Sequence, residues 1–333
     1  MVATYRRSAS LLDTIGDLLV NIGPSYEVIV VDQSPAVAAQ VAFALDRLVA
    51  TGQIRYLRVS PANLPYARNI GLCRALGEVV VYCDDDVRVG PGFLAWHVAC
   101  YSDPSVGAVA GGVRLEGTDH DGAGSAPGDA VGRLLKDGSF TANLHHETPC
   151  DVDFGMGCNM SFRRSALTAI GGFDERYRVN FFREESDVFA RVKRAGYRVR
   201  FEPRAFCLHL RAPTGGARTE DLGERLFATF SNETLFFLHV CRRRYLGLFL
   251  LRMARMIYGN WRSRYGWRRP GWAARACGEM LRGAAIYVWK DPREVSVRSQ
   301  ASGPARRSCP RRFAQLWRAA VARKAKSSRR GNT

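Results

Sequence analysis

The sequence has no long hydrophobic run, no CxxC motif and no visible secretory leader. Its apolar stretches are far shorter than the roughly 20 residues that a membrane-spanning helix needs. No N-terminal segment combines a charged start, an apolar core and a cleavage site. The nine cysteines form no CxxC pair, so they indicate neither a zinc site nor a disulfide framework. We therefore expect a cytoplasmic protein, bound at most peripherally to the inner face of a membrane.

A glycine-rich loop is missing where one class of nucleotide-binding protein needs it. In a dinucleotide-binding fold, an acid placed like Asp32 after a strand holds the ribose, and GxGxxG lies about 20 residues earlier. Residues 1–16 contain no such motif. This absence argues against a dehydrogenase.

Acidic residues are scarce in the C-terminal third of the chain. Residues 1–210 hold 22 Lys+Arg and 24 Asp+Glu, whereas residues 211–333 hold 27 and 7. Such an excess of positive charge predicts an anionic partner, and we favour an anionic membrane surface. No nucleic-acid-binding signature accompanies the charge, so no nucleic acid partner is expected. For residues 291–333, a solvated, disordered tail is the competing interpretation.

Strand and helix patterns alternate in the N-terminal part of the chain. The predicted helices cover 10–20, 36–50 and 66–76, and the predicted strands cover 26–32, 54–59 and 78–84. This alternation implies right-handed crossovers and an α/β fold with a mostly parallel sheet. The two strongest strands end at Asp32 and Asp84, at the edge where open α/β sheets bind ligands.

The remainder of the chain is less regular. Residues 116–150 are rich in Gly, Asp and His with little periodicity, which predicts a long loop over the sheet. After them we expect helices over 163–171 and 184–195, with Gly196 as the cap, and a strand over 197–201. Residues 222–258 are helical in pattern, and either pack as ordinary core or lie in a membrane interface.

Three carboxylates, Asp84, Asp85 and Asp86, directly follow a buried strand. Like charges at a strand end repel one another, and a divalent cation such as Mg²⁺ or Mn²⁺ relieves that cost. Such an ion could also bridge two phosphate oxygens of a bound diphosphate. Most acidic triplets are solvated turns, but the buried strand and the second acid-ended strand at Asp32 favour a metal site here.

A second acidic group, Glu184, Glu185 and Asp187, opens the helix predicted over 184–195. Acids in a first turn often do no more than stabilise the helix dipole. One of them could instead act as a general base toward an acceptor hydroxyl, close to a bound metal. His209 ends an apolar stretch and would ordinarily be a core residue, although imidazole also binds Mn²⁺.

Eight sequence blocks follow one another between residues 2 and 210, and together they resemble the family 2 glycosyltransferases, which have the GT-A fold. The blocks are 2–7, 27–34, 63–71, 83–91, 157–164, 171–175, 182–187, and 196–203 followed by His209. Block 83–91 is similar to the family's DxD block, with Asp84 and Asp86 in the defining places. The chain begins almost inside the first block and lacks the apolar strand that normally precedes it, so either the start of the sequence lies too late or the central strand is truncated.

The resemblance implies an inverting, non-processive transferase that moves one sugar from a UDP-, dTDP- or GDP-sugar to a glycan or lipid-linked acceptor. It implies a role in cell-surface glycan or glycolipid biosynthesis, with Mn²⁺ or Mg²⁺ as cofactor. The implied donor-binding residues are Thr4, Tyr5, Asp32, Arg68, Asp84 and Asp85, and the implied metal ligands are Asp84, Asp86 and His209. Glu185 occupies the position of the base, where the family usually has Asp, so Glu184 and Asp187 stay open.

The expected organisation has five parts. They are a nucleotide-sugar-binding half (1–115), a flexible acceptor-side loop (116–150), an acceptor and catalytic half (151–210), a helical extension (211–290) and the basic tail (291–333). Two other functions are weighed against a transferase. One is an inactive GT-A-like scaffold that binds nucleotide sugars or anionic polymers. The other is a nucleotidyltransferase, which would need a Gly-rich loop after the first strand, and residues 4–9 contain no Gly.

Overall fold

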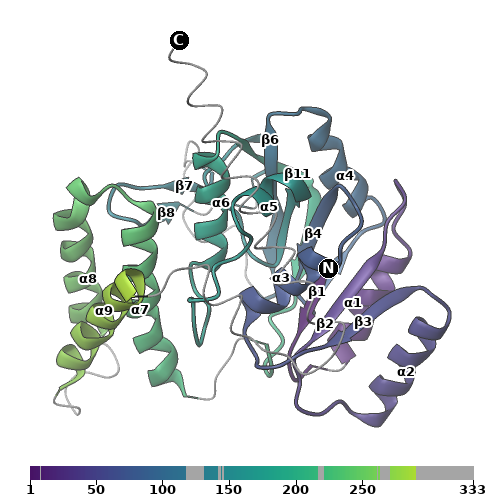
Figure 1. Cartoon of the computed structure of the whole chain (residues 1–333), viewed down its shortest axis with the longest axis horizontal. Helices are drawn as coiled ribbons and strands as arrows, with labels where there is room; N and C mark the ends of the chain where they lie inside the picture. Colours follow the sequence, from purple (N-terminus) through teal and green to yellow (C-terminus); the bar gives the residue numbers. More distant parts are fainter. Residues whose placement is uncertain are drawn as a thin grey trace.

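A mixed sheet, with nine strands among the described residues, forms the centre of the molecule (Figure 1). The computed structural model describes residues 1–7, 9–117, 131–141, 144, 146–216, 221–260, 262 and 271–289. In spatial order the sheet runs β3 (Ile54–Arg58), β2 (Val28–Asp32), β1 (Val2–Thr4), β4 (Val79–Cys83), β10 (Asn159–Arg163), β6 (Val106–Leu115), β11 (Arg198–His209) and β5 (Val87–Val89). β9 (Cys150–Asp151) pairs with β11.

The sheet is mostly parallel, as predicted. β1, β2, β3 and β4 run in one direction, and β6 and β11 share it because β10 is antiparallel to both β4 and β6. Besides β10, only the short strands β5 and β9 oppose that direction in the described sheet. The first strand, β1, has three residues.

Helices cover both faces of the sheet. α1 (Ala9–Leu19), α2 (Ala39–Ala50) and α4 (Phe93–Ala99) cover one face, and α3 (Leu64–Arg74), α5 (Arg164–Ala169) and α6 (Glu184–Arg194) cover the other. Strand β2 shows why: Val28 and Val30 pack against α1 and α2, whereas Ile29 and Val31 pack against α3. A strand buried on both faces reads as a continuous apolar run, which is the pattern of residues 28–31.

The predicted helices match α1, α2, α3, α5 and α6 to within three residues at each end. Gly196 follows α6 with φ +96, the left-handed conformation that the expected cap requires. Beyond it, β11 extends to His209, well past the strand predicted over 197–201.

One central strand, β6, was not predicted. Gly107, Gly111 and Gly112 weaken its strand pattern in the sequence. In the structure the glycines are needed: a Cβ at Gly111 would collide with the Asn159 amide, and one at Gly112 would lie 2.8 Å from the Pro203 carbonyl oxygen. The glycines therefore let two neighbouring segments approach the backbone of β6.

The long loop predicted over 116–150 contains short strands where it is described. β7 (Arg133–Leu134) and β8 (Phe140–Thr141) form a short antiparallel ladder, and β9 joins the main sheet. Residues 118–130 lie outside the described residues, as does the tail expected over 291–333.

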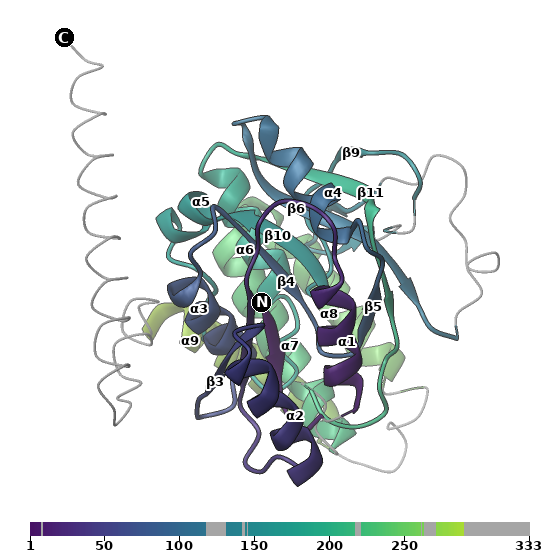
Figure 2. The same ribbon diagram turned by 90° about the vertical axis from the view of Figure 1, so that its right-hand side faces the viewer.

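Three helices extend the molecule beyond α6: α7 (Leu222–Val240), α8 (Leu246–Asn260) and α9 (Trp272–Trp289). Viewed from the side of α1 and α2, they lie behind the sheet (Figure 2). Their shared core contains Phe230, Phe237, Phe249, Met253 and Trp272. The segment predicted as helical over 222–258 forms α7 and α8, separated by a 3-10 turn, η2 (Arg243–Tyr245). In the part of the chain that the structure describes, no helix is long and apolar enough to cross a bilayer.

Candidate active site

The predicted site residues gather at the carboxyl edge of the parallel strands. Thr4 on β1 pairs with Asp32 on β2, and Val2 pairs with Cys83, the last residue of β4. Asp84 to Asp86 therefore emerge beside Thr4 and Asp32. The triplet leads directly into β5, whose Val87 pairs with His209 of β11. This pairing brings a histidine from more than 120 residues later in the chain to the acids.

Asp84, Asp86 and His209 form a candidate metal centre. Their potential ligand atoms all lie within 4.8 Å of one another. His209 Nε2 is 3.2 Å from Asp86 Oδ1 and 4.0 Å from Asp84 Oδ2. Asp86 is buried, whereas a third of the Asp84 side chain is exposed, which leaves one side of the cluster open. Two carboxylates and an imidazole suit Mn²⁺ or Mg²⁺, so the residues present fit a divalent cation.

The charges of this centre are strongly coupled. Burial alone would raise the pKa of Asp86, but His209 and Arg7 lower it to about 2. Burial alone would lower the pKa of His209, but its contacts with Asp86 and Cys158 raise it to about 10. For Asp85, burial raises the pKa to about 7 against the opposing effects of Arg7 and Thr4. Without a metal, the buried carboxylates thus depend on protein cations.

Arg7 is the most prominent site residue that the sequence did not reveal. Its Nη1 contacts Asp86 Oδ2 and lies 3.3 Å from Asp85 Oδ1. Gly215 and Gly216 cover it, with φ of +77 and +65, and a Cβ on either would press on the Arg7 side chain. In the sequence, Arg7 is only an arginine that follows β1, the strand beside β4. Its position alone gives a weak indication that it contacts the acids. A divalent cation entering the cluster has to compete with this guanidinium.

The other predicted donor residues line the same edge. Thr4 Oγ1 donates a hydrogen bond to Asp85 Oδ2 at 2.6 Å. Asp32 accepts hydrogen bonds from the Ser34 backbone and the Tyr56 hydroxyl, at 2.7 and 2.5 Å. Tyr5 follows Thr4 in the turn after β1, with the Arg6 guanidinium 5.1 Å from its ring centroid. The two turns after β1 and β2 thus face the acid triplet.

Arg68 links the triplet to the second acidic group. Its guanidinium lies 3.5 Å from Asp84 Oδ1, donates to the Gly157 carbonyl at 2.9 Å and forms an ion pair with Glu184. A Cβ at Gly157 would lie 2.9 Å from Arg68 Nη2, so a residue without a side chain fits best there. Arg68 is therefore a buried bridge between β4 and the start of α6.

The three acids at the start of α6 have different surroundings. Glu184 is buried against Arg68. Asp187 points elsewhere: Arg191 Nε lies 2.6 Å and His239 Nδ1 2.7 Å from its carboxylate oxygens. Glu185 is partly exposed, has no ion-pair partner among the described residues, and interacts electrostatically with Arg68 and Asp84. Burial is the main cause of its raised pKa. Of the three acids, Glu185 is thus the one that interacts with Asp84 without a close cationic partner among the described residues.

The segment before α6 is strained, and α7 holds it in place. Val179, Phe181 and Arg183 have φ of +62, +51 and +79, a conformation that residues with side chains rarely adopt. Asn232 of α7 donates hydrogen bonds to the Arg178 carbonyl and to Asn180 Oδ1, at 3.1 and 3.0 Å.

A buried ion pair also joins α7 to the segment before α6, and we call these contacts together the clamp. Arg183 Nη2 lies 2.9 Å from Glu233 Oε1 of α7 and donates to the Gly138 carbonyl at 2.8 Å. Arg252 of α8 pairs with the other Glu233 oxygen at 2.7 Å. The helical extension therefore fixes the backbone that leads into Glu184 and Glu185.

A second group of potential metal ligands, Asp174, Asp187 and His239, lies between α6 and α7. Both of its carboxylates already have cationic partners at 2.6 Å, Arg176 for Asp174 and Arg191 for Asp187. A metal ion bound there would be repelled by these two guanidinium groups. We regard this cluster as an ion-pair network that joins α6 to α7.

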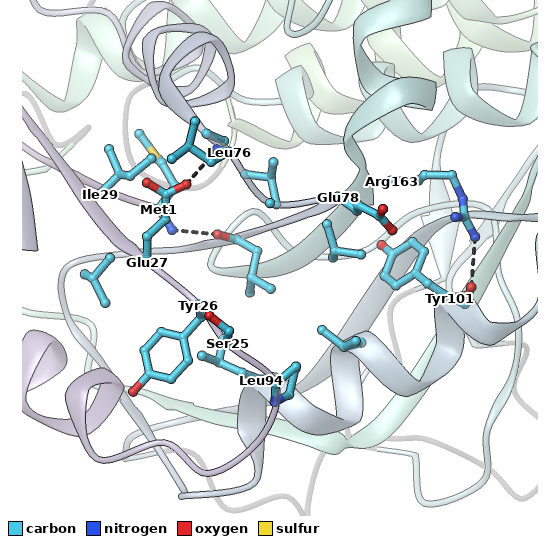
Figure 3. Close-up of a pocket in the computed structure, with 18 of the residues that line it drawn as sticks. Met1, Ser25, Tyr26, Glu27, Ile29, Leu76, Glu78, Leu94, Tyr101 and Arg163 are labelled. Atoms are coloured by element: carbon cyan, nitrogen blue, oxygen red, sulfur yellow. Dashed lines mark hydrogen bonds between the residues drawn. The ribbon is translucent and has the colours of Figure 1, made fainter.

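A cavity of about 820 Å³ lies at the opposite, amino edge of the sheet (Figure 3). β1 pairs with β2 from Val30 onward and with β4 at Cys83, so among the described residues the first residues of β2 and β4 have no β1 partner at this edge. Met1, Glu27 and Tyr101 line the space, together with apolar residues of β2 and β4. The acid triplet is not part of it, so this cavity is separate from the candidate active site.

Comparison with known sequences agrees with this geometry. The family model described as glycosyl transferase family 2 matches residues 1–171, and one described as the N-terminal domain of galactosyltransferase matches residues 141–211. The succinoglycan biosynthesis protein ExoM of Rhizobium meliloti is 27% identical over 231 residues, 68% of this chain and 70% of that protein. A pre-mycofactocin glycosyltransferase of Mycobacterium tuberculosis is 32% identical over 146 residues, 43% of this chain and 29% of that protein.

Solved structures share the fold at low sequence identity. TarS of S. aureus in complex with UDP-GlcNAc matches with a TM-score of 0.60 and 14% identity, covering 99% of this chain and 90% of that one. GalNAc-T7 with UDP, GalNAc and Mn²⁺ matches with a TM-score of 0.53 and 16% identity, covering 71% and 49%. The architecture is that of the GT-A glycosyltransferases, with a helical C-terminal part. Since the family model spans more than half of the sequence, the chain belongs to glycosyltransferase family 2.

Proposed function

We propose that this protein is a metal-dependent, inverting glycosyltransferase that moves one sugar from a nucleotide-sugar donor to an acceptor hydroxyl. The observation that supports this most is the convergence of Asp84, Asp86 and His209 within 4.8 Å at the carboxyl edge of the sheet. Glu185 stands beside them, because its carboxylate interacts with Asp84 and with Arg68. A metal centre and a free carboxylate at one edge are the two parts that such a transfer needs.

Donor binding is assigned to the turns at the carboxyl edge. Asp32 and the Thr4–Tyr5 turn hold the nucleoside, and Arg68 lies near the diphosphate. Asp84, Asp86 and His209 would hold Mn²⁺ or Mg²⁺, and Asp85 positions Thr4. When bound, the cation would supply the positive charge that stabilises the departing diphosphate.

Transfer then needs a base for the acceptor hydroxyl. Glu185 accepts the hydroxyl proton while the acceptor oxygen bonds to the anomeric carbon and the bond from that carbon to the diphosphate breaks. Direct displacement inverts the configuration at the anomeric carbon and leaves no covalent sugar–enzyme intermediate. The raised pKa of Glu185 makes it a stronger base than a solvated carboxylate.

The acceptor is proposed to be a glycan or a lipid-linked saccharide in cell-surface glycan biosynthesis. Succinoglycan biosynthesis, named for the relative ExoM, agrees with a surface-glycan role. The excess of positive charge in residues 211–333 suits a peripheral position on an anionic membrane surface.

A donor-hydrolysis screen tests the proposal. The full chain is incubated with UDP-, dTDP- and GDP-sugars and with Mn²⁺ or Mg²⁺, and nucleotide release is measured. We expect metal-dependent release from one donor, lost in Asp86→Ala and retained in Asp46→Ala, an exposed acid on α2. Normal metal-dependent release by Asp86→Ala would refute the metal role. Saturable donor binding without release from any donor would favour the inactive scaffold instead.

A further inference from the structure

Helix α8 exposes apolar side chains that no other described residue covers. Its inner side, with Phe249 and Met253, is buried against α7 and α9. Its other side carries four leucines, each 42–48% exposed: Leu246, Leu248, Leu250 and Leu251. Single exposed leucines are common on protein surfaces, but four within six residues leave α8 with a largely apolar exposed surface among the described residues, which we call the patch.

Arginines surround this patch, and acids are absent from it. Arg242 and Arg243 lie at the start of η2, the turn before α8, Arg255 lies on α8, and all three are exposed. None of them forms an ion pair with a described residue. Between Glu233 and Glu279 the sequence contains ten arginines and no Asp or Glu. An apolar patch next to cations that have no ion-pair partner among the described residues is complementary to a surface that is apolar inside and anionic outside.

We propose that the α8 face, defined as the four exposed leucines with Arg242, Arg243 and Arg255, docks onto an anionic phospholipid bilayer. The leucines enter the boundary between headgroups and acyl chains, and the guanidinium groups pair with lipid phosphates. This inference deepens the membrane contact proposed above and rests on it. It narrows the proposed membrane-binding region from residues 211–333 to the α8 face.

The geometry favours docking on the membrane over the other partners of an apolar face. α8 has 15 residues, fewer than the roughly 20 needed to span a bilayer, so it lies on the surface. In a symmetric dimer the same face would meet itself and place these arginines opposite one another without acids to balance them. On an anionic lipid surface, each of these positive charges instead makes the free energy of binding more favourable.

Vesicle co-sedimentation of the full chain tests the proposal. Binding to phosphatidylcholine vesicles is compared with binding to vesicles that contain phosphatidylglycerol. One variant carries Leu250→Ser and Leu251→Ser, a second carries Arg242→Gln and Arg243→Gln, and a matched control carries Phe43→Ser and Arg47→Gln on exposed positions of α2. Identical far-UV circular dichroism and melting temperatures establish that the variants are folded.

We expect the wild-type protein and the α2 control to bind the anionic vesicles preferentially. Each α8 variant should bind them roughly tenfold to thirtyfold more weakly. Equal binding to both vesicle types, or undiminished binding by the leucine variant, would overturn the proposal. A dimer in light scattering without lipid that the leucine variant abolishes would assign the face to self-association and overturn it as well.

Donor hydrolysis, measured in parallel without vesicles, separates the two proposals. The α8 variants should hydrolyse donor at the wild-type rate, because α8 contributes no residue to the acid cluster. Loss of membrane binding with intact hydrolysis supports the α8 face. Absence of hydrolysis in the wild-type protein would count against the transferase and leave the docking result standing.

Discussion

Among single residues, Glu185 differs from Glu184 and Asp187 because it has no ion-pair partner among the described residues. We expect Glu185→Gln to lower turnover at least about 100-fold, because the amide cannot accept the acceptor proton. The dissociation constant of the donor, measured by calorimetry, should change little. Asp187→Asn should instead lower the melting temperature, because it weakens a buried carboxylate that Arg191 and His239 share. Normal turnover of Glu185→Gln would show that another residue is the base.

Arg7 and a divalent cation compete for the same carboxylates. Removing this guanidinium with Arg7→Met should strengthen Mn²⁺ binding in the absence of donor by about tenfold, because one nearby positive charge is lost. Titration of free Mn²⁺ by electron paramagnetic resonance measures this directly. Arg6→Met is the matched control, since Arg6 is exposed and contacts the Tyr5 ring rather than an acid. Weaker Mn²⁺ binding by Arg7→Met would contradict the competition.

Glu175 gives a pH dependence of stability that is independent of the metal cluster. Burial raises its pKa from 4.5 to about 7, against a hydrogen bond that Asn69 donates at 2.8 Å. Because the carboxyl of Glu175 binds its proton more tightly in the folded protein than in the unfolded chain, its contribution to stability falls as the pH rises from 4.5 to about 7. Glu175→Gln should remove this slope and raise the free energy of unfolding at pH 7.5 by about 1 kcal/mol, a reduced figure because the side chain is partly exposed. Urea unfolding at pH 5.0 and 7.5 measures both effects, and a larger slope in the variant would rule out this assignment.

Among the elements, α7 does more than extend the fold. Its Glu233 neutralises Arg183, the last of three residues with positive φ before α6. Glu233→Gln should destabilise the protein by about 3 kcal/mol, since it leaves a buried guanidinium without a full counter-charge. It should also lower turnover, because the strained segment then holds Glu185 less firmly. Chemical denaturation and donor hydrolysis check the two effects, with Glu224→Gln, an exposed acid on the same helix, as control. Unchanged stability in Glu233→Gln would show that this ion pair does not hold the segment before α6 in place.

Across the whole molecule, the clamp implies that the sheet and the helical extension unfold together. Tyr177, which precedes α6, packs with Leu235 and Phe236 of α7 in one buried cluster. Shared buried contacts of this kind favour a single cooperative transition. Thermal unfolding followed by far-UV circular dichroism and by tryptophan fluorescence should therefore give one coincident midpoint. Two separated midpoints would mean that α7–α9 form an independent unit.

Much of this architecture is local and was therefore predictable. Alternating helix and strand patterns placed α1 to α3 and β2 to β4, and the acids at Asp32 and Asp84 marked the functional edge of the sheet. The glycines of β6 hid that strand, because their purpose is the close approach of Asn159 and Pro203. The break at η2 was also missed, since the residues on either side share one helical pattern.

The sequence by itself determined the order of strands and helices, the acid triplet and the positive charge of the last third, because periodicity and composition are properties of neighbouring residues. Only the tertiary structure decided which charges meet. It brought His209 to Asp86, placed Arg7 on the same carboxylates, separated Asp187 from Glu185 and exposed one flank of α8. Those outcomes depend on contacts between segments far apart in the chain, which no local pattern specifies.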